Sequence, residues 1–129
     1  MNSNLFERKS FLDGNWMTNN VTEYFSVITT EENVIIQVHL LRATANEANS
    51  FKRYLNSIPT HFKKSTIIDL SDSNFIDSTF LSSIISFNKK VDSEIKLVIT
   101  DRRQLTIFRI TKLDSLFNIY SSLEQAIAA

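Results

Sequence analysis

The chain has 129 residues, of which 43% are hydrophobic and 11% aromatic. A chain of this length and composition forms one hydrophobic core, which excludes a disordered linker and leaves no room for a second folded domain. Fourteen Lys and Arg residues balance fourteen Asp and Glu residues. No net charge attracts a polyanion, so nucleic acid is not an expected partner.

The residue inventory excludes several kinds of site. Cysteine is absent and histidine occurs twice, which is too little for a thiolate site, a histidine-built metal site or a cysteine nucleophile. A single glycine excludes the glycine-rich loops of P-loop and dinucleotide-binding folds. We expect no cofactor and no metal.

The distribution of apolar residues along the chain indicates in which cell compartment the protein is expected. No apolar run is long enough to span a bilayer, and the first residues lack the continuous apolar stretch of a signal peptide. The absence of cysteine fits a reducing compartment. We therefore expect a cytoplasmic protein without direct membrane insertion.

The chain begins with a segment that has no regular hydrophobic period. Residues 1–20 are rich in Asn and predict an N-terminal extension, followed by a single domain over residues 21–129. Two segments rich in β-branched residues, at 25–28 and 34–40, flank a short polar turn. They predict an antiparallel hairpin.

The rest of the chain alternates between strand-like and helix-like hydrophobic periods. Helices are predicted at 44–58, 77–90, 102–112 and 122–129, and strands at 65–70, 95–100 and 116–120. In the third of these helices the apolar positions are Leu105, Ile107, Phe108 and Ile110. Strands that alternate with helices form parallel pairs with right-handed crossovers. The expected fold class is therefore α/β, with a mixed sheet opened by the hairpin and helices packed on it.

Most of the remaining polar residues indicate no specific chemistry. His39 lies in a strand and His61 in a loop, and neither has a Ser or Asp at a triad spacing. No set of base, nucleophile and oxyanion donors can be assembled, so we do not expect an enzyme. The cations Arg102, Arg103 and Lys112 are interpreted as the solvated face of a helix.

Three acidic residues lie close together in the sequence, at Asp69, Asp72 and Asp77. They suggest a magnesium site or a phospho-accepting aspartate of the receiver type. A receiver domain also needs an acidic pair after its first strand, and this chain has Leu41-Arg42-Ala43 at that place. The receiver interpretation is therefore rejected.

One constellation joins a strand end to a helix start. Ile68-Asp69-Leu70 ends a strand, and after a short loop Asp77-Ser78-Thr79-Phe80-Leu81 opens an amphipathic helix. We expect Asp77 or Ser78 to be the N-cap, because a short polar side chain accepts a hydrogen bond from the first turn. The helical period places several hydroxyls opposite the apolar stripe, among them Ser78, Thr79, Ser82, Ser83 and Ser86. Thr79 is thus expected to face solvent, where a kinase can reach it.

This pattern resembles the STAS domain of anti-sigma factor antagonists. That family has a strand ending in Asp-Leu, a short loop, and then Asp-Ser, a Ser or Thr, Gly and Leu. The resemblance covers about three-quarters of the chain, from residue 34 to the C-terminus, and includes the strand at 95–99 and the closing helix around 120–126. This chain departs from the family pattern at Phe80, where the family usually has Gly.

The resemblance implies a non-enzymatic regulatory module in a partner-switching system of bacterial transcription. Its partners would be a GHKL-type serine kinase, which is also the anti-sigma factor, and a phosphatase. Unmodified protein binds the kinase and frees the sigma factor, whereas phosphorylated protein is released. By this resemblance, the phosphate acceptor is Thr79, with Ser78 as the alternative acceptor. A second interpretation of Thr79 is that it is a residue of the first helical turn that is never modified. A monomer or weak dimer is expected.

The surface around this motif is the expected binding site. We predict partner contacts in the loop 71–75, with Asp72 and Asn74, and on the following helix at Phe80, Ser82, Ser83 and Ser86. For Phe80 a second interpretation is open, in which its ring joins the apolar stripe through Ile84. Two other functions also remain: an assembly subunit of a membrane transport complex, such as an ABC lipid transporter, and a component of a stressosome-like scaffold.

Overall fold

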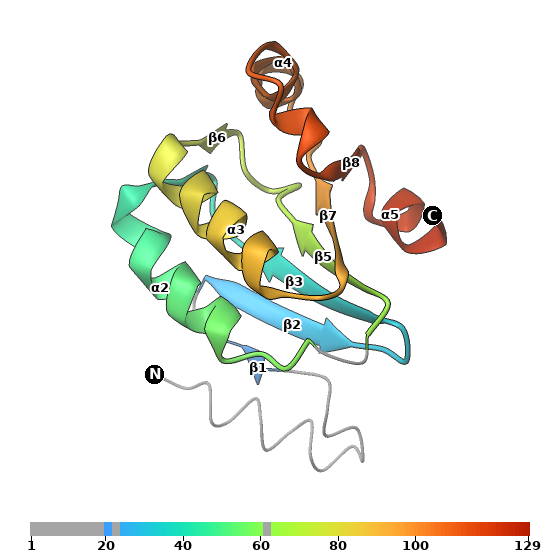
Figure 1. Ribbon diagram of the computed structural model, residues 1–129. Helices are drawn as coiled ribbons and strands as arrows, with labels where there is room; N and C mark the ends of the chain where they lie inside the picture. Colours follow the sequence, from blue (N-terminus) through green and yellow to red (C-terminus); the bar gives the residue numbers. More distant parts are fainter. Residues whose placement is uncertain (1–19, 22–23, 61–62) are drawn as a thin grey trace.

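A six-stranded sheet forms the centre of the protein (Figure 1). The structure, a computed structural model, describes residues 20–21, 24–60 and 63–129. Expectations for residues 1–19 and for His61 lie outside these ranges. The sheet order is β1-β2-β3-β5-β7-β8. These strands are β1 (Asn20–Val21), β2 (Phe25–Thr29), β3 (Asn33–Val38), β5 (Ser65–Asp69), β7 (Glu94–Val98) and β8 (Asn118–Tyr120).

The strand directions confirm the predicted fold class. β1, β2 and β3 pair in antiparallel fashion, whereas β3, β5, β7 and β8 pair in parallel. In the described ranges four helices connect or follow the strands, α2 (Ala45–Asn56), α3 (Ser78–Lys90), α4 (Arg102–Ile110) and α5 (Leu123–Ala128). Each predicted helix and strand of the domain is present, with its ends within two residues of the expected ones.

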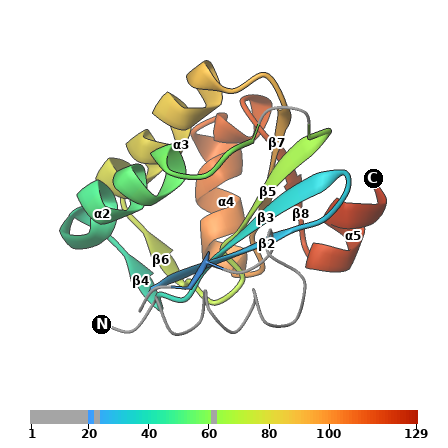
Figure 2. The same ribbon diagram turned by 90° about the horizontal axis from the view of Figure 1, so that it is seen from below.

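Helices cover both faces of the sheet. α2 and α3 lie side by side on one face, and α5 lies on the other (Figures 1 and 2). Alternate residues of the strands point into the first layer, where Phe25, Ile36, Ile68 and Leu97 belong to the main core. The opposite face forms a smaller apolar cluster under α5, made of Ile35, Ile67, Val98 and Ala126. Because both faces are covered, the central strands have apolar residues at consecutive positions.

Three short strands were not predicted: β1 beside β2, and two that pair apart from the main sheet. β4 (Arg42–Ala43) and β6 (Phe75–Ile76) form a separate parallel pair, with Arg42 opposite Phe75. Strands of two residues have no detectable hydrophobic period, so only the tertiary structure identifies them. This pair joins the segment after β3 to the loop before α3.

Only two of the four apolar positions of the third predicted helix contact the core. Phe108 of α4 is buried and Leu105 packs against the core, but Ile107 and Ile110 are exposed. Both isoleucines lie on the side of the helix that is turned away from the sheet, because the buried side is fixed by Gln104 and Phe108. The helix ends at Ile110 and is followed by a short 3-10 turn, η1 (Leu113–Ser115). Among the described segments, none is a helix with the length and apolar character needed to cross a bilayer.

Candidate functional site

The predicted motif lies at the start of α3, and Asp77 is its N-cap. The Phe80 backbone N–H donates to Oδ1 of Asp77 at 2.8 Å. The backbone of Asp77 is extended, with φ −89° and ψ 171°, as is usual for an N-cap residue. Ser78, the other expected cap, is instead the first residue of the helix.

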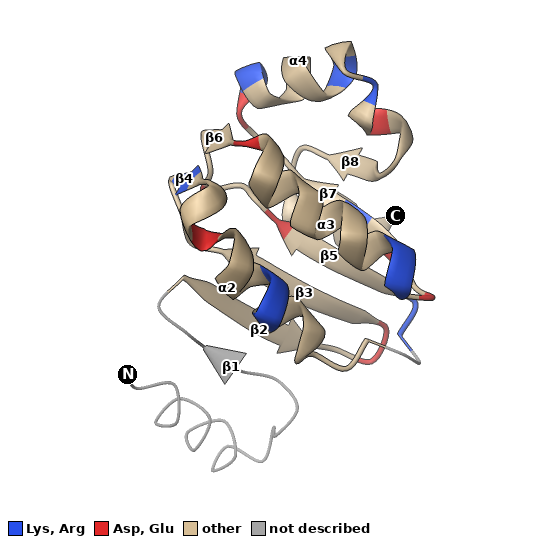
Figure 3. Cartoon of the chain, turned by 60° about the vertical axis from the view of Figure 1, so that its left-hand side comes forward, with Lys and Arg blue, Asp and Glu red and all other residues tan. Residues whose placement is uncertain are grey.

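The second carboxylate oxygen of Asp77 holds the neighbouring helix. Its Oδ2 accepts the backbone N–H of Ala45, the first residue of α2, at 2.8 Å. The start of α2 also has its own capping box, in which the Thr44 backbone N–H donates to Oε1 of Glu47 at 2.9 Å. One carboxylate therefore ties together two helix starts, which lie at the same end of the molecule (Figure 3).

The loop before α3 is fixed from two sides. On one side, the loop bonds to the segment 40–43. The Ser73 hydroxyl donates to the Leu40 carbonyl at 2.6 Å. The backbone N–H of Asn74 donates to the Leu41 carbonyl at 2.9 Å, and that of Asp77 to the Ala43 carbonyl at 3.0 Å. On the other side, the buried amide of Gln104 accepts the Ile76 N–H and donates to the Asn74 carbonyl, both at 3.3 Å. The loop therefore presents the helix start on a fixed backbone.

The hydroxyl groups of Ser78 and Thr79 are exposed, as predicted for Thr79. Within the described part of the chain, neither side chain has a hydrogen-bond partner. One turn later Ser82 is also exposed, and its hydroxyl donates to the Ser78 carbonyl at 2.9 Å. Ser86 is half-buried. On α3, the hydroxyls of Ser78 and Thr79 are thus exposed and without a hydrogen-bond partner among the described residues.

Two of the predicted contact residues are in the core, and the prediction is wrong for them. Phe80 is 0% exposed and stacks on Phe51 of α2, with ring centroids 4.6 Å apart. Ser83 is also buried, and its hydroxyl donates to the Ala48 carbonyl of α2 at 3.3 Å. The buried face of α3 is wider than its apolar stripe because the helix packs on the sheet and on α2 together. For Phe80, the second interpretation is therefore the correct one.

Asp72 and Asn74 lie in the fixed loop. The side chain of Asp72 is 65% exposed, and its Oδ2 is 3.6 Å from Nδ1 of His39. Nε2 of that histidine is 2.8 Å from the hydroxyl of Ser26. The fold thus aligns a serine, a histidine and an aspartate that no sequence spacing indicated. Ser26 is buried in β2. We interpret these contacts as structural, because they connect the loop before α3 to the β2–β3 hairpin.

The three acidic residues of the motif region do not form a cluster. Asp69 is buried and accepts the Ser71 backbone N–H at 3.0 Å, Asp72 faces His39, and Asp77 caps two helices. Among the residues that the structure describes, no group of three or more His, Asp or Glu side chains is placed to hold a metal ion.

Phe75 ends the loop 71–75 that was predicted to contact a partner, and it meets a residue that sequence reasoning missed, Arg42. The Arg42 guanidinium lies 4.3 Å from the centroid of the half-exposed Phe75 ring. Both line an open hollow of about 510 Å³ beside the starts of α2 and α3, together with Thr44, Ala45, Asn46, Glu47 and Asp77. No hydrophobic period marks Arg42, because its strand has only two residues.

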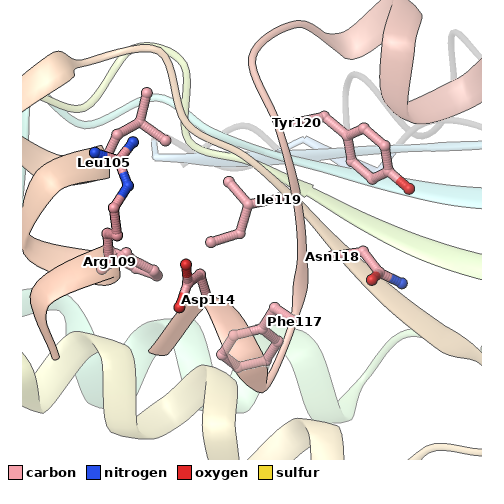
Figure 4. A pocket seen from close by; sticks show the side chains of 8 residues that line it. Leu105, Arg109, Asp114, Phe117, Asn118, Ile119 and Tyr120 are labelled. Atoms are coloured by element: carbon pink, nitrogen blue, oxygen red, sulfur yellow. The ribbon is translucent and has the colours of Figure 1, made fainter. Parts of the chain in front are cut away.

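A second hollow, of about 370 Å³, lies between α4 and β8 (Figure 4). Leu105 and Arg109 of α4 lie on one side and Asn118 and Tyr120 of β8 on the other. None of the residues predicted for the site lines this hollow. It is therefore separate from the start of α3.

Comparisons with known proteins agree with this architecture. The family model described as STAS domain matches residues 24–126. A search of curated proteins finds no match. Three similar solved structures are an anti-sigma factor antagonist from Mycobacterium paratuberculosis, a putative one from Thermotoga maritima, and the anti-sigma factor antagonist SpoIIAA in its unphosphorylated form.

These structures share the fold at low sequence identity. The Mycobacterium protein is 18% identical with a TM-score of 0.72, over 81% of this chain and 90% of that chain. The Thermotoga protein is 22% identical with a TM-score of 0.66, over 81% and 92%. SpoIIAA is 13% identical with a TM-score of 0.55, over 81% and 94%. Together with the family match over residues 24–126, the fold and the motif at the start of α3 show that the chain belongs to the STAS domain family.

Proposed function

We propose that this STAS protein is a partner-switching regulator of the anti-sigma factor antagonist kind. In its unmodified form it binds a GHKL-type serine kinase that is also the anti-sigma factor, and phosphorylation of Thr79 releases it. A phosphatase resets the switch. The observation that carries the proposal is the exposed hydroxyl of Thr79, which has no hydrogen-bond partner in the described chain and lies in the first turn of α3.

The position of Thr79 suits a modification that must not unfold the protein. The first turn of a helix has backbone N–H groups without intrahelical partners, and its dipole favours negative charge by about 0.3–1 kcal/mol. A phosphate on Thr79 would remain in solvent, because the side chain points away from the core. Ser78, exposed beside it, is the alternative acceptor.

The partner surface that we propose surrounds this hydroxyl. It comprises the exposed or half-buried residues Asp72, Asn74, Ser78, Thr79, Ser82 and Ser86. Phe75 and Arg42 extend it across the hollow at the two helix starts. Aromatic and arginine side chains provide much of the binding free energy in protein interfaces. Phe75, rather than the buried Phe80, is therefore the proposed anchor.

The switch follows from the charge of a phosphate. Phosphorylation adds about −1.5 to −2 charges at pH 7. In a complex, this group must lose its hydration or face acidic groups of the partner, which lowers affinity. The free protein meets neither condition, since the acceptor is in solvent. The modification thus removes binding and leaves the fold intact, in a cytoplasmic setting where the kinase has ATP.

The test begins with tagged full-length protein, which is used to isolate its partner and identify it by mass spectrometry. The purified kinase and ATP are then combined with the wild type, Thr79→Ala and Ser78→Ala. Thr106→Ala, which removes an exposed hydroxyl from α4, is the matched control. We expect one phosphate on the wild type and the control, and none on Thr79→Ala. Normal phosphorylation of Thr79→Ala would move the acceptor elsewhere.

Isolation of the partner, together with light scattering, distinguishes the proposed switch from the two other STAS functions. Recovery of a transporter ATPase subunit in place of a kinase would favour the assembly-subunit function. Very large oligomers in light scattering would favour a stressosome-like scaffold. Either result would overturn the proposal of a phosphorylation switch.

A further inference from the structure

We propose that α4 and the turn after it form a docking surface for an anionic lipid membrane. We define the α4 face as the exposed cations Arg102, Arg103, Arg109 and Lys112 together with the exposed apolar residues Ile107, Ile110 and Leu116. This face is separate from the start of α3, so the inference does not depend on the proposed switch.

The apolar part of the face is unusually exposed. Ile110 is 73% exposed, Leu116 50% and Ile107 47%. Ile107 and Ile110 are three residues apart on α4, so their side chains are neighbours on the helix surface. Gln104 and Phe108 hold the opposite side of the helix in the protein. Neither isoleucine belongs to the core, and their exposed surface is available for an external contact.

The cationic part of the face concentrates charge in a chain whose formal net charge is zero. Four of the fourteen Lys and Arg residues lie between 102 and 112, and no Asp or Glu lies in that range. The nearest pairing is weak: Arg103 Nε is 3.9 Å from Oδ1 of Asp101, and the Arg103 side chain is 79% exposed. Figure 3 shows the cations along α4, at one end of the molecule. The only other carboxylate in the adjoining turn is Asp114.

A lipid surface matches this combination better than a second copy of the chain does. Two copies joined through this face would place cations against cations, which opposes association. A membrane rich in anionic lipids attracts Lys and Arg, and its interface accepts apolar side chains without a shaped pocket. The residues that define the α4 face include no aromatic anchor of the kind typical of protein interfaces. The contact is peripheral, because α4 has nine residues and is too short to span a bilayer.

The experiment measures partition of the full-length protein onto vesicles by co-sedimentation. Vesicles of phosphatidylcholine with about one-third phosphatidylserine are compared with vesicles of phosphatidylcholine alone. We expect binding to the anionic vesicles only, and weaker binding when salt is raised from about 0.05 M to about 0.5 M. Equal binding to both vesicles, or binding to neither, overturns the proposal.

Variants then locate the contact on α4. The double variant Arg102→Gln/Arg103→Gln should lower the partition coefficient about 20- to 30-fold. Ile110→Ser should lower it at least about tenfold, through loss of apolar burial. The matched controls are Lys89→Gln/Lys90→Gln at the exposed end of α3 and Ile127→Ser on α5. Both controls should bind as the wild type does, and all four proteins should melt at the same temperature.

Two results would contradict this assignment. If the controls lose binding as much as the α4 variants do, the vesicle contact is not at the α4 face. If soluble polyglutamate binds the α4 face as tightly as anionic vesicles do, and Ile110→Ser leaves both affinities unchanged, the partner is an acidic polymer and no apolar contact with lipid exists.

Discussion

The carboxylate of Asp77 accepts the backbone N–H of Ala45 at 2.8 Å, across a separation of 32 residues in the sequence. Its other oxygen accepts the N–H of Phe80 in its own helix. The motif aspartate therefore has a structural role in two helices at once. It fixes the start of α3, which carries Thr79, relative to the start of α2.

Removing the Asp77 carboxylate should destabilise the protein measurably. Loss of an N-cap costs about 0.5–2 kcal/mol, and the Ala45 N–H also loses its partner. We expect Asp77→Ala to lower the free energy of unfolding by about 1–3 kcal/mol in urea denaturation. Asp77→Asn keeps one oxygen as acceptor and should lose less. Asp92→Ala, which removes an exposed carboxylate from the loop after α3, is the control and should change stability little.

Phe80 and Phe75 form a matched pair that separates stability from binding. Phe80 is fully buried against Phe51, so Phe80→Ala should lower the free energy of unfolding by about 3–5 kcal/mol. Phe80→Gly, which restores the residue usual in the family, should lose about 1 kcal/mol more through helix propensity. Phe75→Ala should cost less than about 1 kcal/mol and weaken partner binding. A stable Phe80→Gly variant with improved phosphorylation would contradict the burial of this ring.

The positions of helices α2 and α3 could be predicted from the sequence. Thr44 with Glu47 and Asp77 are N-cap signals, and the hydrophobic periods of α2 and α3 located both helices. The sequence could not reveal that α3 packs on α2 as well as on the sheet. That second contact buries Ser83, a polar residue at a position that the helical period assigned to solvent. Single-helix periodicity describes one buried face, and this helix has two.

The candidate site was predictable only where it lies in one segment. Asp77, Ser78 and Thr79 are consecutive and were identified. Arg42 and Phe75 meet through a pair of two-residue strands, which have no periodic signal. On α4 the sequence identified four apolar positions without separating buried from exposed ones, and Ile107 and Ile110 are exposed because the buried side of this short helix is narrow.

Lys96 should control the docking of the last helix. It is a buried residue of β7, and its Nζ donates to the carbonyls of Ala126 at 2.8 Å and Ala129 at 3.1 Å. Lys96→Met removes both bonds and the positive charge at the C-terminal end of α5, where a cation is favourable.

We expect the Lys96→Met variant to lose about 1–3 kcal/mol of stability and amide protection in α5 to fall first in hydrogen exchange. Lys90→Met, at an exposed position, is the control for loss of charge. Unchanged protection of α5 in the Lys96 variant would show that apolar contacts alone hold this helix.

Thr79→Glu should separate binding from folding. The side chain is exposed in the first turn of α3, where a negative charge is tolerated. The free energy of unfolding should therefore change by less than about 0.5 kcal/mol. Affinity for the kinase should fall on the order of a hundredfold, which corresponds to about 2.7 kcal/mol. Titration calorimetry beside thermal melting gives both values, with Thr79→Ala as the neutral comparison that retains the partner. If Thr79→Glu binds as tightly as Thr79→Ala, negative charge at this position does not operate the switch, and constitutive assembly with a partner becomes the better account of the α3 surface.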